Sequence, residues 1–181
     1  MSVHYAAPDR TPRRCVGVLM TMAAGVAALF APGLLPGSLR LVYNASDSAP
    51  RGWYAVTGST LNVGDLIVTR LPAQAVELAA TRGYLPAKVP LLKRVGAAYG
   101  EHVCVRGEVV RINGRVMATV LTHDSAGRTL TAWPDCRLLA ENELFLLGIG
   151  HAASFDSRYF GPIPRAAAYG RATPLWVWQA P

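Results

Sequence analysis

The run of residues 15–35 constrains the fold more than any other stretch, because it contains no charged side chain. About 20 residues at a rise of about 1.5 Å each form an α-helix that crosses a bilayer core of about 30 Å. Residues 1–14 include three arginines, and a basic flank favours the cytoplasmic side. We therefore predict a cytoplasmic segment over 1–14, a transmembrane anchor or signal sequence over 15–35, and a periplasmic domain over 40–181.

The same run also fits a cleavable signal peptide, which would release a soluble periplasmic protein. Residues 28–31 read Ala-Leu-Phe-Ala, a small-residue pattern typical of a cleavage site, and Pro32 interrupts the run. We favour the membrane anchor, because a motif with two serines follows the run closely.

The residues after the run are enough for one domain with its own hydrophobic core. The formal net charge is +7, but the arginines are scattered along the chain and do not alternate with aromatic residues. A nucleic-acid groove needs such clustering, so we predict no nucleic-acid partner. A basic surface beside anionic lipid is the interpretation we favour.

Short runs rich in β-branched residues predict a mainly β domain with one or two short helices. Asn113-Gly114 is a strong signal for a two-residue hairpin turn, and Leu144–Ile149 is a continuous apolar run typical of a buried strand. The predicted strands are 52–57, 66–70, 91–95, 102–106, 108–112, 115–120 and 144–149, with a short helix over 73–82 and an exposed loop over 122–131.

The segment from Asn44 to Tyr54 places Ser46 and Ser48 just before a turn that contains Pro50 and Gly52. Such a turn holds a serine hydroxyl on a stiff loop. A serine hydroxyl attacks a carbonyl only when a nearby base removes its proton. The hypothesis that Ser48 is a nucleophile therefore requires a base elsewhere in the chain.

Lys93 is the candidate base, because its neighbours over 89–98 are mostly apolar or small. Burial lowers the pKa of a lysine by disfavouring the ammonium form. Lowering it from about 10.4 to near 7 costs about 4 to 5 kcal/mol, which documented buried lysines reach. On a strand, Lys93 faces away from Leu92 and Arg94. The alternative is a lysine at a sheet edge with its ammonium in water.

Three segments together resemble the ordered motifs of type I signal peptidases, which are membrane-anchored proteases with a Ser-Lys dyad. They are Ser46-x-Ser48 before a proline, Lys93-Arg94-Val95, and Ser154 to Gly161. The sequence of residues 48–54, Ser-Ala-Pro-Arg-Gly-Trp-Tyr, is most similar to that of the TraF-type conjugative transfer peptidases of this family. The resemblance covers most of residues 40–170 and implies a signal-peptidase-like β-barrel or β-sheet catalytic domain.

The resemblance also implies roles for the residues of the first two motifs. Ser48 would be the nucleophile and Lys93 the general base. The hydroxyl of Ser46 would assist the oxyanion hole, whose other donor would be the backbone N–H of Ser48.

In the third motif, the resemblance implies that the Ser154 hydroxyl orients the lysine and that Asp156 and Arg158 brace the site. The alternative for the charged pair is a surface ion pair worth about 0 to 1 kcal/mol. The lead-in over 148–153 reads Gly-Ile-Gly-His-Ala-Ala and departs from the Asn/Asp/Arg-rich lead-in of ordinary signal peptidases. The dyad therefore carries over better than its supporting residues.

Cys104 and Cys136 both fall in the predicted periplasmic domain, whereas Cys15 begins the uncharged run. An oxidising periplasm favours a disulfide between Cys104 and Cys136, and two unpaired core cysteines are the alternative. The histidines are isolated and no Cys-x-x-Cys spacing occurs, so we predict no metal and no cofactor.

The predicted function is that of a serine endopeptidase at the inner membrane that matures a pilin precursor by way of an acyl-enzyme, by hydrolysis or transpeptidation. The pilin substrate and the conjugative transfer machinery as partner are implied by the resemblance alone. One alternative is a general signal peptidase for exported preproteins, and another is a non-catalytic periplasmic assembly factor. Trp176 and Trp178, near the end of the sequence, would either cap the core or touch the membrane interface.

Overall fold

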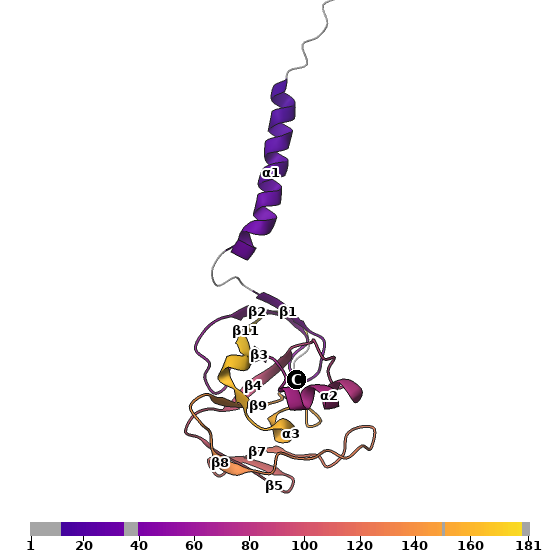
Figure 1. Cartoon of the computed structure of the whole chain (residues 1–181), viewed down its shortest axis with the longest axis vertical. Helices are drawn as coiled ribbons and strands as arrows, with labels where there is room; N and C mark the ends of the chain where they lie inside the picture. The colour runs from indigo at the N-terminus through magenta and orange to yellow at the C-terminus, as the bar shows by residue number, and fades with distance from the viewer. Residues whose placement is uncertain (1–11, 35–39, 150, 179–181) are drawn as a thin grey trace, which may run out of the picture. The chain divides into compact units, whose positions relative to one another are not determined.

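The computed structural model describes residues 12–34, 40–149 and 151–178, and the chain divides into two units, 1–38 and 39–181. The first unit contains helix α1, Pro12–Leu34 (Figure 1). Helix α1 covers most of the run for which we predicted a transmembrane anchor or signal sequence. Most of the cytoplasmic segment predicted over 1–14 lies outside the described residues. Among the helices that the structure describes, none combines the length and the apolar character needed to cross a membrane.

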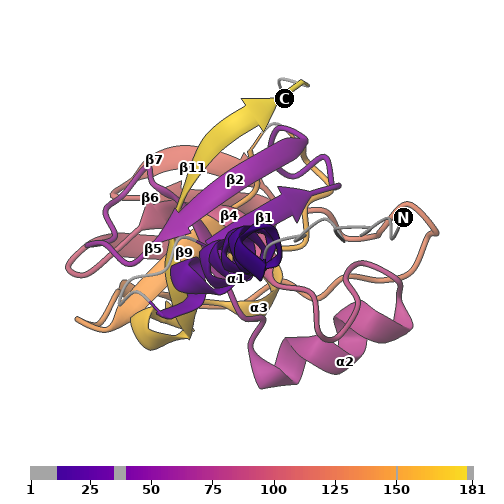
Figure 2. The ribbon, with the colours of Figure 1, turned by 90° about the horizontal axis from the view of Figure 1, so that it is seen from above.

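The second unit is built around a seven-stranded sheet in the order β1-β2-β11-β3-β4-β9-β10. Every neighbouring pair is antiparallel, and Figure 2 shows β1, β2 and β11 lying side by side. The mainly β fold is thus confirmed. The strands are β1 Arg40–Asn44, β2 Gly52–Thr57, β3 Leu66–Thr69, β4 Leu91–Ala97, β9 Glu143–Leu147, β10 Ile163–Pro164 and β11 Ala168–Val177.

A four-stranded antiparallel sheet, in the order β7-β6-β5-β8, lies at the end of this unit away from β1 and β2 (Figure 1). Asn113 and Gly114 both have positive φ, 50° and 78°, as a two-residue type I′ hairpin requires. The predicted hairpin is confirmed. The strands are β5 His102–Arg106, β6 Val109–Ile112, β7 Arg115–Thr119 and β8 Cys136–Leu138.

The helices of this unit are short, as predicted. Helix α2 spans Ala73–Thr81 and buries Ala75 and Ala79. Helix α3 spans Ser157–Phe160, and a 3₁₀ helix follows over Arg165–Ala167.

Strand β9 is buried on both faces, which explains its continuous apolar sequence. Leu144 and Leu146 pack into one hydrophobic cluster with Ile67 and Val95. Phe145 and Leu147 face the other way and pack into the cluster beneath the four-stranded sheet. The chain that leaves β9 toward the third motif is therefore anchored in two cores at once.

Strand β11 is the main element that we did not predict from the sequence. It lies between β2 and β3 in the sheet, with register shifts beside Gly170 and Pro174. A side chain at Gly52, which has φ +150°, would lie 2.7 Å from the Cα of Val177, so glycine permits the close approach of the two strands. Trp176 is 72% exposed and does not cap the core.

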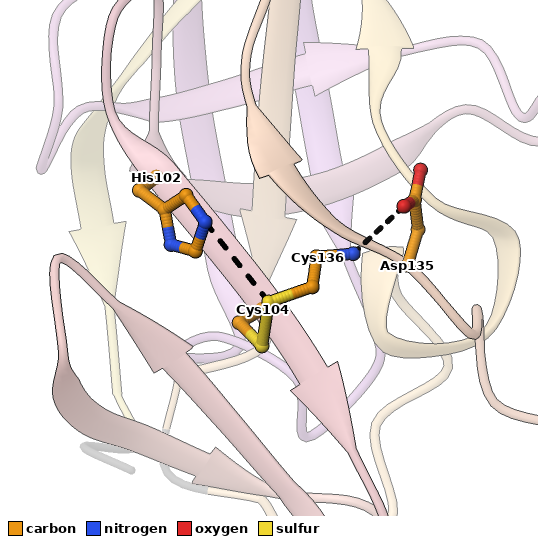
Figure 3. Close-up of a disulfide and its surroundings, with 4 residues drawn as sticks. All are labelled: His102, Cys104, Asp135 and Cys136. Atoms are coloured by element: carbon orange, nitrogen blue, oxygen red, sulfur yellow. Dashed lines mark hydrogen bonds between the residues drawn. A yellow bond between two sulfur atoms is a disulfide. The ribbon is translucent and has the colours of Figure 1, made fainter.

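The four-stranded sheet contains a disulfide between Cys104 on β5 and Cys136 on β8 (Figure 3). The two residues are direct cross-strand partners, and this pairing is the one favoured from the sequence. Nε2 of His102 lies 4.0 Å from Sγ of Cys136. The backbone N–H of Cys136 donates to Oδ1 of Asp135 at 2.7 Å.

Candidate active site

The serine loop, residues 45–51, connects β1 to β2 and is held by the side chain of Asn44 at the end of β1. Asn44 is buried, and its Nδ2 donates to the carbonyl oxygens of Ser46, Ala49 and Pro50 at 3.0, 2.9 and 3.1 Å. Its Oδ1 accepts from the backbone N–H of Ser46 at 3.2 Å and from the Ser46 hydroxyl at 2.9 Å. One buried amide therefore sets the shape of the whole loop.

The hydroxyl oxygens of Ser46 and Ser48 lie 2.9 Å apart, within hydrogen-bond distance. The carbonyl oxygen of Ser48 accepts from the backbone N–H of Ile149 at 2.9 Å, which ties the loop to the chain that follows β9. The hydroxyl of Tyr54 donates to the carbonyl oxygen of Pro50 at 2.6 Å. The loop is thus restrained at both of its ends and at Ser48 itself.

Lys93 is presented by β4, where it pairs with Ile67 of β3. Its side chain is buried, and only 2% of the residue is exposed. Burial lowers the pKa of Lys93 to about 8, although the negative charge of Asp156 opposes the shift and the positive charge of Arg158 adds to it. A substantial fraction of Lys93 is therefore neutral near pH 8 and able to accept a proton.

Ser154 is buried and accepts a hydrogen bond on Oγ from Nζ of Lys93. The backbone of Gly148 packs directly against this serine. A Cβ at position 148 would overlap Oγ and Cβ of Ser154 and would lie 3.4 Å from Oδ2 of Asp156. The glycine therefore makes room for the contact between Ser154 and the lysine.

Asp156 and Arg158 form a fully buried pair with two parallel hydrogen bonds. Nε of Arg158 donates to Oδ1 at 2.8 Å and Nη2 donates to Oδ2 at 2.9 Å, and the side chains are 0% and 4% exposed. Asp156 caps α3 by accepting from the backbone N–H of Arg158 at 3.1 Å. The two side chains meet because the chain turns into a helix at this point.

The other donors of Arg158 hold the backbone around Ser154. Nη2 donates to the carbonyl oxygen of Ser154 at 2.7 Å, and Nη1 donates to those of Ala152 and Thr119 at 2.8 and 2.6 Å. Because an unpaired buried charge is costly, these contacts make Arg158 a rigid support. The support acts on Ser154 and, through it, on the lysine.

A cavity of about 630 Å³ is lined by four of the predicted site residues. Among the hydrogen bonds of the described residues, Lys93 pairs with Ser154 and the Ser48 hydroxyl pairs with Ser46, and none joins Ser48 to Lys93. Ser46, Ser48, Lys93 and Ser154 all line the cavity, whereas Asp156 and Arg158 are not among its lining residues. The walls are mostly apolar and include Val42, Leu85, Pro86, Val89, Leu121, Leu130, Phe155 and Tyr159. A buried amine and two hydroxyls that share an apolar cavity match what nucleophilic acyl transfer requires.

Asn44 is the supporting residue that we did not assign from the sequence. An Asn at the end of a strand and immediately before a turn often bonds to backbone groups of that turn. That signal was present but did not indicate which backbone groups Asn44 would hold. Within the described part of the chain, no cluster of His, Cys, Asp or Glu side chains is arranged to hold a metal ion.

Comparison with known proteins gives matches over nearly the whole chain. The family model described as "Signal peptidase, peptidase S26" matches residues 13–178. Plasmid transfer protein TraF of Escherichia coli is 32% identical over 166 residues, covering 86% of this chain and 92% of that protein. Conjugal transfer protein TraF of Agrobacterium tumefaciens strain 15955 is 32% identical over 178 residues, covering 92% and 98%.

Among solved structures, a signal peptidase I from Enterococcus faecalis V583 matches with a TM-score of 0.41 and 22% identity. It covers 64% of this chain and 99% of the solved chain.

Proposed function

The chain belongs to the signal peptidase family, peptidase S26, as a TraF-type member, and on that premise we propose that it is a membrane-associated serine endopeptidase that matures a pilin precursor in conjugative transfer. The observation that carries the proposal is Lys93, which is buried, has a pKa lowered to about 8, and lines the same cavity as Ser48. The names of the relatives, which refer to plasmid and conjugal transfer, support the biological setting.

In the first step, the neutral amine of Lys93 accepts the proton of the Ser48 hydroxyl while Oγ attacks the carbonyl carbon of the scissile peptide bond. The resulting oxyanion accepts hydrogen bonds from the backbone N–H of Ser48 and from the hydroxyl of Ser46. Donors placed in advance around a developing negative charge are worth roughly 3 to 4 kcal/mol each. The 2.9 Å contact between the two serine hydroxyls places Ser46 beside the proposed nucleophile. To serve the oxyanion, the Ser46 hydroxyl must turn its proton away from Oδ1 of Asn44.

In the second step, the ammonium of Lys93 returns the proton to the departing amine, and the C–N bond breaks to leave an ester on Ser48. Water or a free amine then attacks the ester, which gives hydrolysis or transpeptidation, respectively. Throughout, Ser154 accepts one N–H of Lys93, which leaves the nitrogen lone pair for Ser48. The pair of Asp156 and Arg158 supports Ser154 from behind.

We place the catalytic domain in the periplasm at the inner membrane, with the uncharged run of residues 15–35 as anchor. The disulfide between Cys104 and Cys136 supports an oxidising compartment. Exposed aromatic side chains on β1, β2 and the C-terminal segment support contact with a membrane interface, where tryptophan is enriched. These side chains are Tyr43, Trp53, Trp176 and Trp178.

The test is the processing of a pilin precursor in membranes by the full-length protein and its variants. We expect Ser48→Ala and Lys93→Ala each to lower the cleavage rate by roughly 10⁴-fold or more, because the two residues act as one unit. Lys88→Ala and Ser59→Ala are matched controls, since both residues are exposed, and neither should change the rate. Unchanged processing by both site variants would show that the chain is a non-catalytic assembly factor.

The same assay separates a pilin-specific enzyme from a general signal peptidase. A panel of exported preproteins is added to the pilin precursor in equal amounts. We expect cleavage of the pilin precursor alone, and equal cleavage of the panel would overturn the pilin assignment.

A further inference from the structure

One wall of the active-site cavity is a turn that leads out of the four-stranded sheet, residues 121–131. Leu121, Asp124, Ser125 and Leu130 of this segment line the cavity. The turn is closed by backbone hydrogen bonds from Leu130 N–H to the Thr122 carbonyl at 2.8 Å and from Gly127 N–H to the Asp124 carbonyl at 3.0 Å. The loop that we predicted here is therefore an ordered turn facing the cavity.

The carboxylate of Asp124 fastens this turn to the segment that follows α2. It accepts from the hydroxyl of Tyr84 and from Nε of Arg128, the latter at 2.6 Å. Oδ1 of Asp124 also accepts from the backbone N–H groups of Ala126 and Arg128, both at 2.9 Å. The side chain of Asp124 is only 6% exposed, whereas that of its partner Arg128 is 40% exposed.

Two arginines add hydrogen bonds between the turn and the segment after α2, one donated from each side. Nη1 of Arg82 donates to the carbonyl oxygen of Thr129 at 2.8 Å, and Nη2 of Arg128 donates to the carbonyl oxygen of Arg82 at 3.0 Å. Tyr84 is held in turn by α2, because its backbone N–H donates to the Ala79 carbonyl at 2.8 Å. The contact between Tyr84, Asp124 and Arg128, which we name the clasp, thus joins a turn and a helix that lie about 40 residues apart in sequence.

The clasp continues into the aromatic wall of the same cavity. The ring of Tyr84 lies 5.2 Å from that of Phe155, and Phe155 stacks on Tyr159 at 5.7 Å. The hydroxyl of Tyr159 accepts from the backbone N–H of Leu121 at 3.1 Å. Phe155 directly follows Ser154, the partner of Lys93, so the wall and the catalytic lysine share one packed unit.

Building on the proposed function, we propose that the clasp of Tyr84, Asp124 and Arg128 is a specificity determinant. It holds residues 121–131 closed against the segment after α2, which sets the size of the side chain that a substrate can present to Leu121 and Leu130. A bulky or charged side chain enters only when the clasp opens. Tyr84 and Asp124 themselves line the cavity, and we assign them the role of positioning Leu121 and Leu130.

The turn contributes little to the stability of the fold, so its effect on specificity can be measured separately. Most side chains over 122–129 are exposed, so opening the clasp uncovers little apolar surface. The large hydrophobic clusters of the domain contain none of these residues. Loss of the clasp should therefore loosen the wall and leave the fold intact.

The test uses Asp124→Asn, Tyr84→Phe and the double variant of the full-length protein, with peptides that differ at one position near the scissile bond, as Ala, Leu, Phe or Lys. We expect kcat for the best peptide to stay within twofold, KM to rise about threefold, and discrimination in kcat/KM against Phe and Lys to fall about tenfold. Because Tyr84 and Asp124 share one contact, the double variant should show the same loss of discrimination in kcat/KM as each single variant. Asp135→Asn, which alters an exposed pair with Arg137, is the matched control.

Hydrogen exchange gives a readout that does not depend on peptidase activity. In Asp124→Asn, amides over 121–131 should exchange at least tenfold faster, and those of β9 should not change. Unchanged exchange over 121–131 would refute the clasp, and faster exchange with unchanged discrimination would refute its role in specificity. If the unmodified protein cleaves no peptide, the proposed function fails, and binding of the same peptides to Ser48→Ala then decides whether the clasp sets selectivity.

Discussion

Two arginine–carboxylate clusters in this domain have the same hydrogen-bond lengths but different surroundings. Arg158 binds Asp156 behind the lysine at 2.8 and 2.9 Å, with side chains 4% and 0% exposed. Arg137 binds Glu143 beside the four-stranded sheet at 2.7 and 2.9 Å, with side chains 38% and 23% exposed. Because the distances are so similar, we expect burial to decide how much stability each pair contributes.

The two regions are accordingly stabilised in different ways. Around Ser154 and Lys93, buried charges and hydrogen bonds hold a polar site inside an apolar cavity. In the four-stranded sheet, a disulfide joins neighbouring strands and the charged groups stay partly in water. The first region is therefore sensitive to single substitutions, and the second depends on its covalent bond.

The largest expected effect is the loss of stability when the buried arginine is removed. Arg158→Leu leaves the carboxylate of Asp156 buried and unpaired, and we expect a loss of about 3 to 5 kcal/mol in the free energy of unfolding. Arg137→Leu, the matched control, should cost at most about 1 kcal/mol. Urea denaturation of both variants measures the difference, and equal losses would break the comparison.

The disulfide should matter for stability and not for catalysis. We expect Cys104→Ala combined with Cys136→Ala to lower the free energy of unfolding by about 2 to 4 kcal/mol. The kcat/KM of the folded protein at 25 °C should stay within twofold, because neither cysteine lines the cavity. The unmodified protein in reductant is the control and should unfold like the variant. A large loss of activity at full folding would contradict the separation of the two regions.

A methyl group at Gly148 probes the packing behind the lysine. Gly148→Ala would collide with Ser154, and we expect overpacking to cost about 1 to 3 kcal/mol of stability. The loss in kcat should be larger than this loss of stability explains, because Ser154 must move away from Lys93. Gly58→Ala serves as the control, since a Cβ there meets nothing within 4 Å. Equal activity of the two variants would show that the Ser154 contact is dispensable.

The smallest expected effect is on pH dependence, about 1.4 kcal/mol for each pH unit. Because the pKa of folded Lys93 is about 8, kcat/KM should rise roughly tenfold per unit below pH 8 and level off above it. Unfolded lysine, with its higher pKa, binds more protons between about pH 8 and 10.4, so stability should rise with pH in that window. A flat rate profile from pH 6 to 9 would contradict the assignment of Lys93 as base.

Much of this architecture could be predicted from local sequence patterns. Alternating β-branched residues and Asn113-Gly114 predicted most strands, and the continuous apolar run after Glu143 predicted the buried strand β9. The motifs around Ser48, Lys93 and Ser154 predicted residues that meet in one cavity, because the resemblance carried information on the fold that local patterns lack.

The remainder could not be predicted because it depends on long-range contacts. Strand β11 contains Gly170 and Pro174, which argue against a strand locally, and it forms because β2 and β3 both pair with it. The bond between Tyr84 and Asp124 spans 40 positions and has no sequence signature.

The position of β11 also bears on the order in which the domain assembles during synthesis. The serine loop belongs to the β1-β2 hairpin on one side of β11, and Lys93 belongs to β4, which follows β3 on the other side. Because β11 follows Ser48, Lys93 and Ser154 in the sequence, the seven-stranded sheet becomes continuous only after residues 168–177 have been synthesised. A chain that ends before residue 168 would therefore lack the strand that joins the β1-β2 hairpin to β3.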